Sequence, residues 1–133
     1  MEVEWGSEFE KALERAEMEA NSGDQVANVR YKYLLALLGE LEELHNRPNF
    51  ESRTFKRVRQ AKRYELWRVA HPYHESVAVR IIVWFPSSEK AVLALFAFDK
   101  AKLGDIWYDR ATRESEANLD QWRRENPERM EGN

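Results

Sequence analysis

The chain has 133 residues, 43% of them hydrophobic, and it carries a formal net charge of −3 with no cysteine. This composition favours one domain, expected over residues 1–125 and followed by a disordered tail at 126–133; the absence of cysteine excludes disulfides, Fe–S clusters and thiolate zinc sites. No apolar run is long enough to span a bilayer and no cleavable signal opens the chain. We therefore expect a cytoplasmic protein without membrane contact.

The first part of the chain predicts a short strand followed by two helices. Residues 2–5 alternate between polar and apolar side chains, which is typical of a strand. Ser7 and Glu10 have the spacing of a capping box, which predicts that a charged helix begins there. Asp24 can cap a second helix over 24–46, where apolar residues recur every three or four positions.

The second part predicts three strands and a closing helix, because the hydrophobic period changes to two. The strands are expected at 64–70, 77–85 and 91–98, joined by connections short enough for antiparallel pairing. In the middle strand, alternate apolar residues line one face, and the other face carries Arg80, Ile82 and Trp84. With a last helix from Asp105 to about Arg124, the sequence predicts an α+β domain whose helices cover one face of an antiparallel three-stranded meander.

Positive charge is concentrated in one segment of this acidic chain. Residues 51–80 carry 8 basic and 3 acidic side chains, a net charge of +5. Such a segment can bind the phosphates of RNA or DNA, or it can offset the acidic helices through solvated ion pairs. The candidates for RNA binding in this segment are Lys56, Arg57, Arg59, Lys62 and Arg63.

A second group of candidates follows the last predicted strand. Lys100 and Lys102 lie where a rigid sheet would end, a good position for holding a phosphate, and Tyr108 could donate or accept a proton. The alternative is a surface loop followed by core aromatics. His71 and His74 could carry protons from a turn, but no third ligand accompanies them, so we expect no metal or other cofactor.

Several motifs in one order resemble the RelE/HigB superfamily of toxins, most closely a phage-derived branch found in actinobacteria. They are VEWGSEFE, LLGELEELHNRP, a basic segment leading into YELWRV, RIIVWF and DKAKLGDIWYD, and together they span most of residues 2–124. The resemblance implies a RelE-like fold and the toxin of a type II toxin–antitoxin system. Such a toxin inhibits translation as a metal-independent, ribosome-dependent mRNA endonuclease. The implied partners are the ribosome, mRNA and a cognate antitoxin of helix-turn-helix type.

The resemblance also implies roles for particular residues. Arg68 resembles the basic residue of the strand before the hairpin. Lys100 and Lys102 resemble the basic loop after the last strand, and Tyr108 resembles the tyrosine that opens the closing helix. In the family, the substrate 2′-hydroxyl attacks the adjacent phosphate while Lys and Arg stabilise the developing charge. The alternative is a non-catalytic binding module on the same fold, such as a phage immunity or regulatory protein or a ParE-like gyrase inhibitor.

Overall fold

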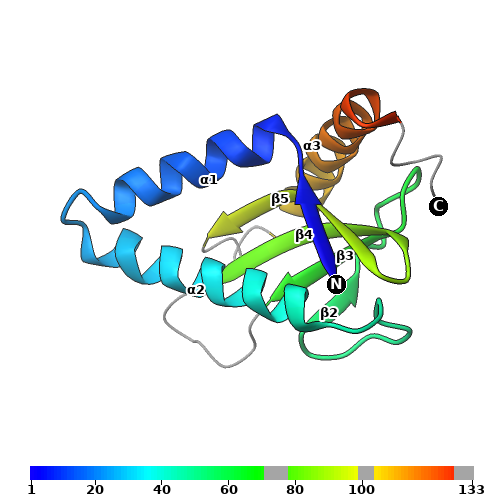
Figure 1. The fold of residues 1–133 in the computed structure, drawn as a ribbon, viewed down its shortest axis with the longest axis horizontal. Coiled ribbons are helices and arrows are strands. Elements are labelled where there is room, and N and C mark those ends of the chain that lie inside the picture. Colours follow the sequence, from blue (N-terminus) through cyan, green and yellow to red (C-terminus); the bar gives the residue numbers. More distant parts are fainter. Residues whose placement is uncertain (71–77, 99–103, 128–133) are drawn as a thin grey trace.

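The computed structural model describes residues 1–70, 78–98 and 104–127, with the backbone alone for 104–106 (Figure 1). These residues form five strands and three helices. In order they are β1 (Glu2–Trp5), α1 (Ser7–Ala20), α2 (Gln25–Glu43), β2 (Phe55–Arg57), β3 (Leu66–Ala70), β4 (Val79–Ser87), β5 (Lys90–Phe98) and α3 (Gly104–Glu125). Among the described residues, no helix is both long enough and apolar enough to cross a bilayer.

The strands form one mixed sheet in the order β1-β5-β4-β3-β2, so the α+β class is confirmed. β3, β4 and β5 pair antiparallel at the three predicted places, while β1 adds to β5 in parallel. The predicted three-stranded meander lacks one strand, because β2 also pairs antiparallel with β3. This strand has only three residues, and its exposed Lys56 and Arg57 give it no hydrophobic alternation to detect.

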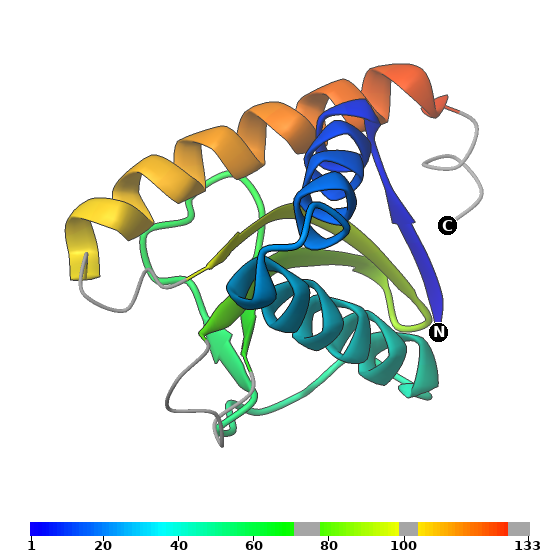
Figure 2. The same cartoon turned by 90° about the vertical axis from the view of Figure 1, so that its left-hand side faces the viewer.

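Helices cover both faces of the sheet, and the prediction of one covered face is wrong. α1 and α2 pack through Phe9, Leu34, Leu37 and Leu41 against one side of the strands, which includes Ile81, Val83 and Leu93. α3 packs on the opposite side through Trp107, Ala111, Leu119 and Trp122 against Leu66, Ile82 and Val92 (Figure 2). The central strands are apolar on both sides, so each side needs its own cover.

Of the three predicted helix starts, the one at Asp105 lies one residue inside α3, and the other two had different outcomes. Asp24 caps α2 as predicted, since its Oδ1 accepts hydrogen bonds from the backbone nitrogens of Val26 and Ala27 at 3.0 and 3.2 Å. The capping box at Ser7 is wrong, because α1 is capped by Gly6 without a side-chain hydrogen bond. The carboxylate of Glu10 instead accepts a hydrogen bond from the indole of Trp5.

Three predicted features lie outside the described residues. They are the histidine turn with His71 and His74, the loop with Lys100 and Lys102, and the tail from residue 128 onward. Within the described residues, the alternation predicted for the middle strand is confirmed, because Ile81 and Ile82 belong to opposite hydrophobic clusters.

Candidate nucleic-acid interface

Arg68 lies on β3, on the face of the sheet that α3 covers. It pairs directly with Lys56 on β2 and with Ile82 on β4, so these three side chains share that face. Arg68 is half-buried, and its Nε has no hydrogen-bond partner among the described residues. Its one hydrogen bond there, from Nη2 to the carbonyl oxygen of Arg53, is long at 3.5 Å. Within the described residues, the guanidinium of Arg68 is therefore held by only one long hydrogen bond.

A groove of about 220 Å³ opens beside Arg68. It is lined by Lys56, Arg57, Val58, Arg59, Gln60, Arg68 and Tyr108, and we call it the basic groove. Tyr108 comes from the second turn of α3, where its ring meets Trp107 edge-on at 4.7 Å between centroids. The groove thus joins two stretches, around residues 56–68 and at residue 108, that the sequence nominated separately.

The other candidates of the basic segment lie beyond Gln60. Lys62 and Arg63 line a neighbouring cavity and are not part of the basic groove. Lys100 and Lys102 lie outside the described residues, so their proposed roles remain predictions. Within residues 1–70, 78–98 and 104–127, no three His, Asp or Glu side chains come together as a metal site requires.

Acidic residues accompany two arginines of the groove. Arg59 Nη2 lies 3.7 Å from Glu51 Oε2, and Arg57 Nη2 lies 3.8 Å from Glu65 Oε1. A hydrogen bond from the backbone nitrogen of Arg57 holds the pKa of Glu51 below its usual value, with a smaller effect from Arg59. These ion pairs are long and exposed, so each contributes little and can be exchanged for a phosphate.

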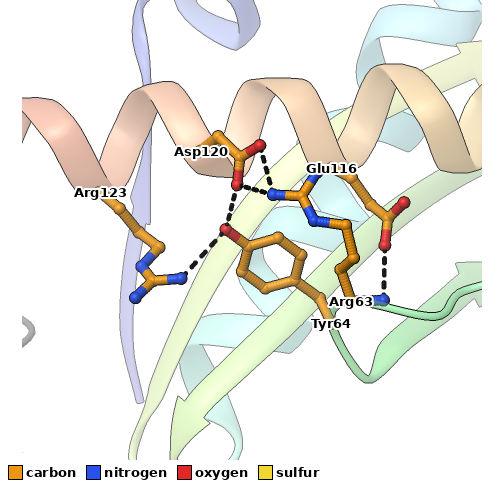
Figure 3. A network of polar contacts seen from close by, with 5 residues as sticks. All are labelled: Arg63, Tyr64, Glu116, Asp120 and Arg123. Carbon is orange, nitrogen blue, oxygen red and sulfur yellow. Dashed lines mark hydrogen bonds and ion pairs between the residues drawn. The ribbon is translucent and has the colours of Figure 1, made fainter.

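A second polar network ties the end of the basic segment to α3 (Figure 3). The Arg63 guanidinium pairs with the Asp120 carboxylate, and the Tyr64 hydroxyl donates to Asp120 Oδ1 at 2.6 Å. The backbone nitrogen of Arg63 donates to Glu116 Oε2 at 2.8 Å, and Arg123 Nη1 donates to the Tyr64 oxygen at 3.4 Å. We call this network the Asp120 clamp. In the clamp the guanidinium of Arg63 is paired with a carboxylate, and the contacts hold the end of the basic segment against α3.

The pKa values in the clamp follow from these contacts. The hydrogen bond from Arg63, supported by that from Tyr64, holds the pKa of the Asp120 carboxyl below its usual value. Burial, and then the hydrogen bond to Asp120, raises the pKa of the Tyr64 phenol. Asp120 is therefore ionised and Tyr64 protonated at neutral pH, which is the state that the clamp requires.

Arg80 is a further basic residue on the same face of the sheet. It pairs with Ala70, two positions along β3 from the pair of Arg68 with Ile82, so Arg68 and Arg80 are diagonal neighbours across β3 and β4. Alternation along the strand predicts this placement, but Arg80 lies beyond the basic run and the alternation alone does not mark it as a site residue. Arg80 therefore adds positive charge next to Arg68.

Compared with protein-family models, with curated proteins and with solved structures, the chain matches none of them.

Proposed function

We propose that the chain has a RelE-like fold and is the toxin of a type II toxin–antitoxin pair, cleaving mRNA on the ribosome without a metal. The observation that carries this proposal is the basic groove, where Arg68 and Tyr108 lie together with Lys56 and Arg59. The order of sequence motifs supports the same assignment independently of the groove. The ribosome, the helix-turn-helix antitoxin and a cytoplasmic location rest on the resemblance to the RelE/HigB superfamily.

The residues of the groove suit cleavage of RNA by its own 2′-hydroxyl. The 2′-oxygen would form a bond to the adjacent phosphorus while the bond to the 5′-oxygen breaks, leaving a cyclic phosphate and a 5′-hydroxyl. Arg68, whose side chain lines the groove, is suited to stabilising the charge that develops on the phosphoryl oxygens. Tyr108 is suited to passing the proton from the 2′-oxygen toward the 5′-oxygen.

The other side chains of the groove would position the RNA. Lys56 and Arg59 provide separate positive charges along it, which suits successive phosphates of a single strand. Lys100 and Lys102 would add charge stabilisation in this proposal, as the resemblance implies. No group of the reaction requires a metal, because the positive charge comes from side chains.

A non-catalytic binding module is the second candidate. Its supporting observation is that three arginines of the basic segment already have carboxylate partners, namely Arg57 with Glu65, Arg59 with Glu51 and Arg63 with Asp120. Ion pairs of this kind are also what a segment with only a structural role would form.

Primer extension on an mRNA in a reconstituted translation reaction tests the reaction itself. We expect new 5′ ends, seen as premature stops of the extended primer, when the protein and ribosomes are both present. Cleavage of the naked mRNA alone would contradict ribosome dependence. Intact mRNA at all protein concentrations would favour the binding module.

A further inference from the structure

A larger cavity adjoins the basic groove and has a different chemistry. Its volume is about 590 Å³, within the range of about 300–1,000 Å³ that is typical of small-molecule sites. It is lined by Gln60, Lys62, Arg63, Asp109, Thr112, Arg113 and Glu116, and we call it the Glu116 cavity. The mixture of carboxylates with basic side chains distinguishes its lining from that of the groove, which includes no carboxylate.

The cavity continues the path of the groove. Gln60 lines both hollows. Tyr108 in the groove and Thr112 in the cavity are four residues apart on α3, and residues with this spacing are neighbours on one face of a helix. A strand whose phosphate lies in the groove can therefore place an adjacent base in the cavity.

Glu116 offers a hydrogen-bond acceptor at the wall of this cavity. The residue is only 9% exposed, and its Oε2 accepts the hydrogen bond from the backbone nitrogen of Arg63 (Figure 3). No described residue donates to its other oxygen, Oε1. An ionised carboxylate only accepts hydrogen bonds, so a ligand that fits here presents N–H groups.

Thr112 supplies a second polar group that lacks a partner. It is 5% exposed, and its Oγ1 is buried without a hydrogen bond among the described residues. A buried hydroxyl without a partner is unfavourable, and such a group in a folded protein requires an explanation. A ligand in the cavity would explain the unpartnered Thr112 hydroxyl, since a hydroxyl can both donate and accept a hydrogen bond.

We propose that the Glu116 cavity is a nucleobase subsite that selects guanine next to the phosphate held in the basic groove. This inference rests on the proposed function. Guanine presents two adjacent N–H donors and a carbonyl acceptor on its Watson–Crick edge, where the carboxylate of Glu116 can accept from both donors. Adenine, cytosine and uracil each present a single donor group on that edge. The Glu116 carboxylate would repel a phosphate placed against it, whereas it can accept hydrogen bonds from the N–H groups of a base.

The test is equilibrium binding of the wild-type protein to four labelled single-stranded RNAs. All are oligouridine except for one central position, which is G, A, C or U, and the three central riboses are 2′-deoxy so that the RNA cannot be cut there. We expect the RNA with G to bind about tenfold more tightly than the others, since a bidentate contact to a base gives this order of discrimination.

Variants on α3 assign the preference to the cavity. Glu116→Gln keeps an acceptor for the Arg63 nitrogen but cannot accept from both guanine donors, so most of the preference for G should disappear. Glu114→Gln makes the same change of charge at an exposed position outside the cavity and should keep the preference. Thr112→Val replaces the hydroxyl with a methyl group and should reduce the preference about threefold. Circular dichroism verifies that each variant is folded, and Thr112→Val provides the test if Glu116→Gln is not.

The possible failures point to different conclusions. The guanine subsite would be overturned if the wild-type protein bound all four RNAs equally. If Arg68→Ala then abolished that binding, the proposed function would still stand. A preference for G that both Glu116→Gln and Thr112→Val retain would overturn the subsite as well. If the wild-type protein binds none of the RNAs, with or without ribosomes, the proposed function fails and the subsite fails with it.

Discussion

Asp120 is the residue on which two parts of the chain depend for their relative position. Its carboxylate accepts hydrogen bonds from Arg63 and Tyr64, which lie 57 and 56 residues earlier in the sequence. The ring of Tyr64 is buried against Trp84, with centroids 5.0 Å apart. Together with Glu116 and Arg123, this side chain attaches the basic segment to α3, and the basic groove lies beside that junction.

We predict that Asp120→Asn destabilises the protein by about 1–2 kcal/mol at pH 7, because the buried Tyr64 hydroxyl loses a charged acceptor. The ion pair with Arg63 adds less, since that side chain is more than half exposed and solvent screens it. The measurement is urea unfolding of both proteins.

The same comparison has a defined pH dependence. Because the pKa of Asp120 is lowered by folding, its stabilisation is present above its ordinary pKa and is lost as pH falls through the folded value. The difference between wild type and Asp120→Asn should therefore be largest near neutral pH and shrink in acid. A difference that grew as the pH fell would contradict the assignment of the clamp.

Single residues differ in how far the sequence predicts them. Arg68 and Tyr108 can be nominated from local motifs, because each lies in a short pattern that a resemblance can match. Asp120 and Glu116 cannot, since each is one of several carboxylates on a charged helix. Their importance comes from contacts with the segment around Arg63, and only the folded chain shows these contacts.

At the scale of elements, hydrophobic period predicted most of the fold. The central strands and α2 lie near their predicted positions because each carries a regular apolar pattern, whereas α1 and α3 were predicted from their expected N-terminal caps. β2 and the side of the sheet chosen by α3 were not predicted. β2 is a short charged strand that is held by pairing with β3. The side of the sheet that α3 covers depends on Leu66, Ile82 and Val92, which form the second apolar face.

We predict that Leu119→Ala destabilises the protein by about 2–5 kcal/mol, as expected for a fully buried leucine. Leu35 on α2 is 45% exposed and is the matched control, for which the same change should cost well under 1 kcal/mol. Thermal or urea unfolding distinguishes the two. Equal, small effects would mean that α3 does not cover the second face of the sheet.

At the scale of the whole molecule, the fold separates its charges. The first 50 residues carry 11 acidic and 5 basic side chains, a net charge of −6, and they include α1 and α2 on one face of the sheet. The basic groove lies on the other face, beside α3. A chain with a net negative charge can in this way keep a positive surface for a polyanion.

This separation predicts salt-dependent binding of single-stranded RNA. If Lys56, Arg59 and Arg68 each contact one phosphate, the logarithm of the binding constant should fall with the logarithm of salt concentration with a slope of roughly −2. Arg59→Gln should reduce the magnitude of that slope by about 0.7. Fluorescence anisotropy at several salt concentrations measures both. Affinity that did not change with salt would contradict phosphate binding by the groove.

The central claim is that the basic groove cleaves RNA, and the most direct measurement is the rate of mRNA cleavage on translating ribosomes by groove variants. The test protein carries Arg68→Ala and Tyr108→Phe, and the control carries Arg15→Ala and Tyr31→Phe on the opposite face of the sheet. We predict that the groove variant loses at least about 100-fold in rate, because both charge stabilisation and proton transfer are removed, while the control stays near wild type. Cleavage by the groove variant at the wild-type rate would show that the reaction takes place elsewhere.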